Sequence, residues 1–258
     1  MGDVWTGGES YEPYVGRWSR LVAPLFLDWL GAGAGQRWLD VGCGTGALTS
    51  AILARCDPVE VNGVDPSDGY IAWATSHVDD ARARFVVADT TDLPPGPVDV
   101  VVSGLVLNFV ADPRAALAAM RARAPEGIVA GYVWDYAGRM DLIRRFWDAA
   151  VELDPEAVDL DEGVRFPICQ PDRLEALWRE NGFVDVASDA IDVPTVFRDF
   201  EDYWTPFLGG QGPAPGYAMS LDEPHRAELR NLIRARLPID RQGSIRLTAR
   251  AWAVRGRC

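Results

Sequence analysis

Trp38 to Gly46 reads WLDVGCGTG, and this stretch decides the fold because an apolar run leads through Asp40 into glycines at alternate positions. Arg37 to Val41 reads as a short buried β-strand, and Ala47 to Arg55 has the spacing of an amphipathic helix. The glycines therefore occupy a turn between a strand and a helix. Glycine adopts positive φ and lets a ligand approach the backbone, while the amide groups at a helix start favour an anionic group. We expect this turn to bind a ligand.

The glycine spacing distinguishes between cofactors. The pattern D-x-G-x-G-x-G differs from the G-x-G-x-x-G of dinucleotide-binding folds, and Asp40 would repel a pyrophosphate. An acid at this position suits a ligand with an ammonium group, such as the amino-acid end of S-adenosylmethionine. The stretch WLDVGCGTG resembles the first motif of the class I S-adenosylmethionine-dependent methyltransferases almost letter for letter. A weaker resemblance of YVGRWSR, near the start of the chain, favours a bacterial small-molecule subgroup of type 11 or 25.

Three further stretches match this family in order. Glu60 to Val64 is a second apolar run that ends at Asp65, and an acid there can accept hydrogen bonds from both ribose hydroxyls, although nicotinamide folds use it in the same way. Arg84 to Ala88 and Val98 to Ser103 are two more strands. The glycine turn and the resemblance together imply cofactor contacts at Asp40, Gly42, Cys43, Gly44, Asp65, Pro66, Asp89, Thr90, Thr91 and Ser103, with the corner after Asp89 meeting the adenine.

The cofactor carboxylate needs a cation that none of these acids supplies. Arg17 opens the helix predicted over Arg17 to Leu30, and its planar guanidinium matches a carboxylate. Tyr14 would then lie over the sulfonium and exclude water. We therefore expect residues 1 to 17 to form a cofactor-dependent lid, although Arg17 and Tyr14 would equally suit a segment packed on the surface.

Strand and helix patterns alternate along the chain, which favours a parallel sheet with both faces covered. Later strands are predicted over Gly127 to Val133, Phe183 to Val193 and Ser244 to Arg255. The resemblance implies an α/β, Rossmann-like sheet of seven mostly parallel strands with an antiparallel last strand. We predict one domain over residues 1–258, with a lid-like insert over about 199–240 between the last two strands.

Candidate acceptor-binding residues lie in two places. Trp134, Asp135 and Tyr136 follow the fifth predicted strand, at an edge where open α/β sheets place ligands. Trp204 and Phe207 belong to the aromatic insert, which is either a cover for the substrate or a small satellite core. If the acceptor carries an acidic proton, Asp135 or a tyrosine such as Tyr14 would be the catalytic base.

Composition limits the partners. The net charge of −13 disfavours nucleic acid, because phosphate binding requires clustered Lys and Arg. The sequence has no signal-peptide pattern and no apolar run long enough to span a membrane, so we expect a cytoplasmic protein that does not bind membranes. The four cysteines have neither paired nor metal-ligand spacing, so no metal is expected. The oligomeric state stays open.

The sequence therefore predicts a methyltransferase that uses S-adenosylmethionine to methylate O, N or C of a small-molecule acceptor by in-line displacement. Two alternatives stay open. One is a nicotinamide-dependent oxidoreductase on a similar sheet, which Asp40 and the glycine spacing disfavour. The other is a noncatalytic protein that binds the cofactor to regulate or scaffold, since a fold does not determine a function.

Overall fold

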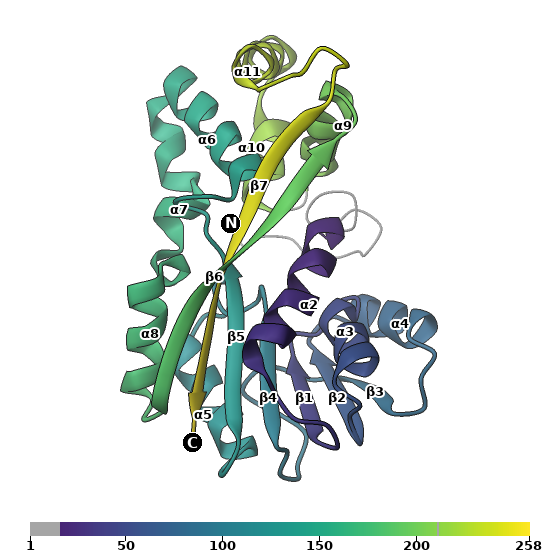
Figure 1. The fold of residues 1–258 in the computed structure, drawn as a ribbon. Coiled ribbons are helices and arrows are strands. Elements are labelled where there is room, and N and C mark those ends of the chain that lie inside the picture. The colour runs from purple at the N-terminus through teal and green to yellow at the C-terminus, as the bar shows by residue number, and fades with distance from the viewer. Residues whose placement is uncertain (1–15, 211) are drawn as a thin grey trace. The chain divides into compact units, whose positions relative to one another are not determined.

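The computed structural model describes residues 16–210 and 212–258 (Figure 1). This part of the chain divides into two compact units. The sheet unit comprises Ser19–Val133, Ile168–Ile191 and Ala251–Cys258. The insert unit comprises Trp134–Pro167 and Asp192–Arg250, together with residues 16–18. The single domain with a terminal lid stays a prediction.

The sheet has seven strands in the order β3-β2-β1-β4-β5-β7-β6, of which six run parallel and the last is antiparallel. This arrangement confirms the predicted fold class. The bounds of the strands are β1 Arg37–Val41, β2 Glu60–Asp65, β3 Ala83–Val87, β4 Val100–Gly104, β5 Ile128–Trp134, β6 Val184–Phe197 and β7 Ile245–Arg257.

The strand order reverses between β1 and β4. β1 pairs with β2 on one side, where Asp40 lies opposite Gly63, and with β4 on the other, where Asp40 lies opposite Val102. The chain then continues outward to β3 on one side and to β5 on the other. In open α/β sheets, ligands bind at the carboxyl ends of the strands that flank such a reversal. The fold therefore places the glycine turn at the expected ligand site.

Helices cover both faces of the sheet unit (Figure 1). Phe26 lies 4.8 Å from Tyr132 between ring centroids, whereas a Cβ atom on Gly131 would lie 3.6 Å from the Trp178 ring. Neighbouring strand residues point to opposite faces, so the helices that carry Phe26 and Trp178 cover opposite faces. The helices of this unit are α2 Arg17–Leu30, α3 Ala47–Arg55, α4 Asp68–His77, α5 Pro113–Arg123 and α8 Pro171–Glu180.

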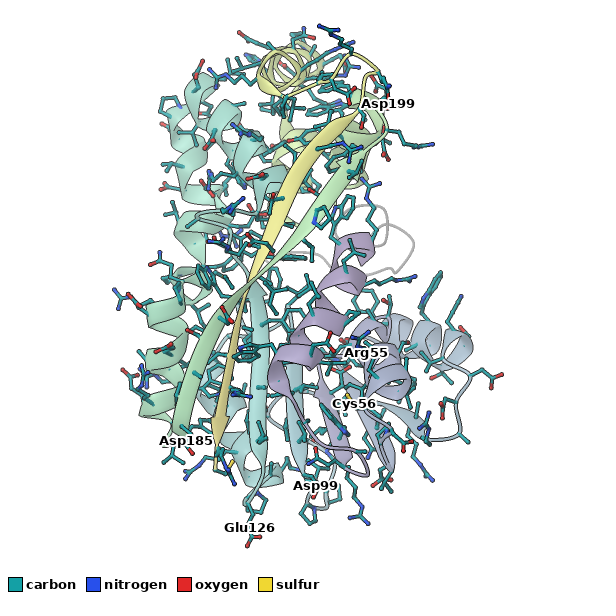
Figure 2. All side chains as sticks on the ribbon, in the orientation of Figure 1. Arg55, Cys56, Asp99, Glu126, Asp185 and Asp199 are labelled. Atoms are coloured by element: carbon teal, nitrogen blue, oxygen red, sulfur yellow. The ribbon has the colours of Figure 1, made fainter. Side chains whose placement is uncertain are left out.

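Side chains cap the starts of α4 and α5. The Ser67 hydroxyl accepts a hydrogen bond from the Tyr70 amide, and the Asp112 carboxylate accepts one from the Ala115 amide. Figure 2 shows Asp99 and Glu126 at the lower edge of the sheet unit, at the amino ends of β4 and β5. The glycine turn follows the carboxyl end of β1 and therefore belongs to the opposite edge.

Strand β6 is longer than predicted. It continues to Phe197, because Val193, Thr195 and Phe197 are buried while the residues between them are exposed. The prediction ended at Val193, and the next residue, Pro194, cannot donate a ladder hydrogen bond. β6 is an edge strand of the sheet, where a missing donor is tolerated.

The insert unit contains helical segments and the remaining parts of β6 and β7. An aromatic cluster forms its core: Phe146 stacks on Phe207 with ring centroids 4.6 Å apart, and the Tyr203 hydroxyl donates to the Leu142 carbonyl oxygen at 2.9 Å. No helix in the described ranges is both long and apolar enough to cross a membrane. The remaining α-helices are α6 Asp141–Leu153, α7 Glu162–Arg165, α9 Phe200–Trp204, α10 Pro213–Ser220 and α11 Glu223–Arg236. The short 3-10 helices are η2 Pro155–Leu160, η3 Pro167–Cys169, which lies at the boundary between the units, and η4 Thr205–Gly209.

Candidate functional site

The glycine turn has the left-handed backbone that its sequence predicts. Gly42, Gly44 and Gly46 have φ angles of 75°, 52° and 84°. A Cβ atom on Gly42 would lie only 2.4 Å from Cγ2 of Val106, whereas a Cβ atom on Gly44 would meet no atom of the described residues within 4 Å. Gly42 is therefore required by packing as well as by conformation. The space at Gly44 is open to a ligand.

Backbone hydrogen bonds fix the turn to the neighbouring strand. The amides of Gly42 and Cys43 both donate to the Val64 carbonyl oxygen, at 2.8 and 2.9 Å. Gly46 occupies the N-cap position of α3 and offers no side chain to cap it. The Thr49 amide in the first turn of α3 is bonded to Asp40, and the start of a helix also favours an anionic or polar ligand group.

Asp65 holds the same turn from the end of β2. Its Oδ2 accepts a hydrogen bond from the Gly44 amide at 3.0 Å, and its Oδ1 accepts one from the Ser67 amide at 2.9 Å. The side chain is buried, and burial raises the pKa of Asp65. A carboxylate oxygen accepts more than one hydrogen bond, so Asp65 retains capacity for ribose hydroxyls.

Asp40 is the most buried acid of the site, with 1% of its surface exposed. Its Oδ2 accepts a hydrogen bond from the Thr49 hydroxyl at 2.7 Å, but its Oδ1 has no partner in residues 16–210 and 212–258. Burial raises the pKa of Asp40 to about 7. A buried carboxyl oxygen that lacks a partner matches an ammonium group of a ligand. The sequence missed Thr49, because the helical pattern did not show that its hydroxyl faces β1.

The corner after β3 is stabilised by hydrogen bonds to the carboxylate of Asp89. Oδ1 of Asp89 accepts hydrogen bonds from the Thr91 amide at 3.0 Å and the Thr91 hydroxyl at 2.9 Å. These hydrogen bonds lower the pKa of Asp89. Thr90 is buried, whereas Pro66 on the neighbouring β2 exit is exposed. Asp89 therefore orders the backbone of this corner. An adenine would contact the segment from Asp89 to Thr91 and not the Asp89 carboxylate alone.

The exit of β4 completes the cofactor region in the sheet unit. Ser103 is buried, and its hydroxyl has no hydrogen-bond partner within the described ranges. Gly104 leaves no room for a side chain, because a Cβ atom there would lie 2.6 Å from the Tyr132 hydroxyl. The structure thus brings all predicted cofactor residues from Asp40 to Ser103 into one unit.

The predicted acceptor residues belong to the insert unit. Trp134, Asp135 and Tyr136 are all buried there. Oδ2 of Asp135 accepts a hydrogen bond from the Arg139 amide at 3.0 Å and closes the turn that follows β5. A Cβ atom on Gly138 would lie 2.4 Å from the same oxygen. In this structure Asp135 therefore orders a loop, and its role as a base stays a prediction.

Trp204 and Phe207 contribute to the core of the insert unit. Trp204 is 3% exposed and Phe207 is fully buried. Trp204 stacks on Phe200 at 6.5 Å between ring centroids, while Phe207 stacks on Phe146. This packing favours the satellite core over the substrate cover. Acceptor binding by these two residues stays a prediction.

Arg17 has a protein partner in this structure. Its Nη1 donates to Oδ1 of Asp202 at 3.0 Å, and its guanidinium lies 4.4 Å from the Trp18 ring and 4.8 Å from the Phe197 ring. To bind a cofactor carboxylate, Arg17 would have to leave Asp202. Tyr14 and residues 1–15 of the predicted lid lie outside the described residues.

The comparison with known proteins points in one direction. A family model described as "Methyltransferase domain" matches residues 39–130. The demethylmenaquinone methyltransferase of Beutenbergia cavernae is 34% identical over 185 residues, which are 64% of this chain and 74% of that protein. The malonyl-[acyl-carrier protein] O-methyltransferase of Hahella chejuensis is 36% identical over 98 residues, or 37% of this chain. This second match spans only 35% of that relative's own length.

Solved structures with a similar fold include the "putative methyltransferase" of Bacillus halodurans C-125, with a TM-score of 0.59 and 12% identity over 91% of this chain and 97% of that one. Phosphoethanolamine N-methyltransferase 2 of Haemonchus contortus, solved with S-adenosyl-L-methionine, has a TM-score of 0.56 and 16% identity over 91% of this chain and 52% of that one. At these identities the likeness concerns the fold alone.

Gly42→Ala tests the packing of the glycine turn. The added methyl group meets Val106 and forces a left-handed conformation on alanine, so we expect a loss of about 2 to 4 kcal/mol in the free energy of unfolding. Urea denaturation measures it. Gly33→Ala is the matched control, since the one contact that its Cβ atom would make with the described part of the chain is with the Gln36 side chain at 3.9 Å. Equal stability of the two variants would contradict the assignment.

Phe207→Ala tests the core of the insert unit. Truncating a fully buried ring leaves a cavity, so we expect the free energy of unfolding to fall by about 3 to 5 kcal/mol. Leu208→Ala, at a side chain that is 42% exposed, should change it by less than about 0.5 kcal/mol. A Phe207→Ala variant of unchanged stability would instead favour a ring that faces a substrate.

Proposed function

Because the chain belongs to the class I S-adenosylmethionine-dependent methyltransferases, we propose that it transfers the methyl group of S-adenosylmethionine to a small-molecule acceptor. The observation that most supports this proposal is the unpartnered Oδ1 of Asp40 beside the left-handed glycine turn. An ammonium group there would complete the hydrogen bonding of a buried acid. Membership of this family leaves the nicotinamide-dependent alternative without support.

The residues of the sheet unit fit the parts of the cofactor. Asp40 would hold its ammonium group, and Asp65 its ribose hydroxyls. Gly44, where no Cβ atom fills the space, would let the ligand approach the backbone. The corner from Asp89 to Thr91 would border the adenine. The bound cofactor supplies an electrophilic methyl group on a sulfonium, and the protein must align the acceptor with it.

The acceptor is proposed to be a small molecule. Relatives are named for methylation of malonyl-[acyl-carrier protein] and demethylmenaquinone, which are chemically different acceptors. The excess of acidic over basic residues, 38 against 25, also disfavours a nucleic acid. We propose methylation at O, N or C, with Asp135 or Tyr14 as base where a proton must leave.

Turnover of labelled S-adenosylmethionine with a panel of carboxylic acids, phenols and amines tests the function. We expect label to appear in at least one acceptor. Asp40→Asn is the control, because it keeps the shape of the side chain but weakens the pairing with an ammonium group. Binding of S-adenosylhomocysteine without turnover of any acceptor would favour the noncatalytic alternative.

Cofactor affinity should depend on pH through Asp40. The pKa of this acid is about 7 in the free protein, and an ammonium ligand favours its ionised form, so binding lowers the pKa and releases a proton. The dissociation constant for S-adenosylhomocysteine should therefore rise as the pH falls below 7, by up to about tenfold per pH unit. Calorimetry between pH 5 and 8 measures it. The Asp40→Asn variant should bind weakly with little pH dependence, and an equally steep dependence there would exclude Asp40 as the titrating group.

Asp65→Ala should weaken S-adenosylhomocysteine binding by at least about tenfold, since each hydrogen bond to a carboxylate contributes about 1.5 to 3 kcal/mol. Asp65 also orders the Gly44 amide, so thermal melting should accompany the calorimetry. Asp68→Ala, at an exposed acid of α4, is the control. Unchanged affinity in a folded Asp65→Ala variant would remove Asp65 from the site.

A further inference from the structure

The turn that follows β4 carries a buried polar group that the proposed cofactor contacts do not use. Asn108 is 8% exposed, and its amide nitrogen Nδ2 has no hydrogen-bond partner among the residues that the structure describes. The Phe109 amide donates to the Val106 carbonyl oxygen at 2.8 Å, so Asn108 lies inside a tight turn. Buried side-chain donors are nearly always paired, and an unpaired donor has lost the hydrogen bonds that water would provide. The Asn108 amide therefore lacks an oxygen acceptor.

Backbone contacts hold this turn beside the glycine turn. Val106 packs directly against Gly42, where no Cβ atom would fit. The Leu105 amide donates to the Tyr132 carbonyl oxygen at 2.7 Å, and Leu105 has a φ angle of 64°, which is strained for leucine. Such strain persists only where the surroundings hold it, and it is frequent at ligand sites. Asn108 is thus carried on a constrained segment next to the cofactor turn.

Asn108 lies in the turn after β4, beyond Ser103, which is the last of the expected cofactor residues. Asp40 and Asp65 lie at the ends of β1 and β2, on one side of the reversal in strand order. Asn108 follows β4, on the other side. Under the proposed function the ends of β1, β2 and β3 hold the cofactor and Ser103 at the end of β4 borders it, so the turn after β4 lies beside the cofactor, where the second reactant must bind. An amide N–H group pairs with an oxygen, and most strongly with an anionic one.

We propose that Asn108 binds the methyl acceptor through Nδ2–H, and that the acceptor presents an anionic oxygen, either a carboxylate or a phenolate. This inference rests on the proposed function. A lone pair of that oxygen forms the new bond to the methyl carbon, while the bond from this carbon to sulfur breaks and its electron pair goes to sulfur. The negative oxygen and the positive sulfonium thereby become a neutral ester or ether and a neutral thioether. No proton is removed in the step, because the acceptor oxygen is already ionised.

Heteronuclear NMR of the Asn108 side chain tests the proposal. The full chain is saturated with S-adenosylhomocysteine and titrated with octanoate in one arm and para-nitrophenolate in the other. The Asn108 amide signals are assigned as the pair that is lost in Asn108→Leu. We expect these signals to shift with one probe, which identifies a carboxylate or a phenolate site. Signals that stay unmoved with both probes overturn the proposal, whereas failure of S-adenosylhomocysteine to bind contradicts the proposed function itself.

Variants separate acceptor binding from a structural role. Asn108→Leu should weaken binding of the responding probe by about tenfold to a hundredfold, and should change the affinity for S-adenosylhomocysteine by less than about twofold. Asn108→Asp should weaken probe binding further, because it adds a like charge. Thr195→Val is the matched control, since Thr195 is fully buried with an unpartnered hydroxyl in the insert unit. Equal weakening in the control, or loss of cofactor affinity in Asn108→Leu, overturns the proposal.

Discussion

The left-handed backbone from Gly42 to Gly46 is the constraint on which the rest of the site depends. Three positive φ angles within five residues reverse the chain between β1 and α3, and only glycine adopts them without strain. The carbonyl oxygen of Val64 accepts two amides of the turn, and Asp65 accepts a third. Because these partners lie in and at the end of β2, the turn is stable only when β1 and β2 are paired.

The same constraint explains why polar groups are buried at the site. The glycine turn packs against Val106, and Asp40 is buried next to this turn. One carboxyl oxygen of Asp40 accepts a hydrogen bond from Thr49, and the other has no partner among the described residues. Burial disfavours the charged form, which is why the pKa of Asp40 rises to about 7. A cationic ligand group would offset the free-energy cost of burying the Asp40 carboxylate. The site in the free protein therefore favours binding of such a group. The exit of β4 has similar features, since Leu105 has a strained backbone and the Asn108 amide nitrogen has no partner among the described residues.

The insert unit is organised by different interactions. Its aromatic side chains form a core of their own, in which Phe207 contacts both Phe146 and Tyr203. Arg144 forms a paired contact with Asp161 and also donates to the Tyr136 carbonyl oxygen at 3.2 Å. These contacts order the loop that carries Asp135 and Tyr136. Residues that resemble a substrate pocket in composition can therefore serve mainly to stabilise a unit.

The sequence by itself determined the alternation of strands and helices, the helix that begins at Arg17, and the glycine turn with Asp40 and Asp65. These features follow from local rules of chain geometry, since periodicity, capping and positive φ depend on residues close together in the chain. Only the tertiary structure decided the pairing of Arg17 with Asp202, the end of β6 beyond Pro194 and the burial of Asn108. Each of these depends on which distant segment lies beside the residue, or on whether its strand is at the edge of the sheet. Partners far apart in sequence are selected by packing, which no local pattern encodes.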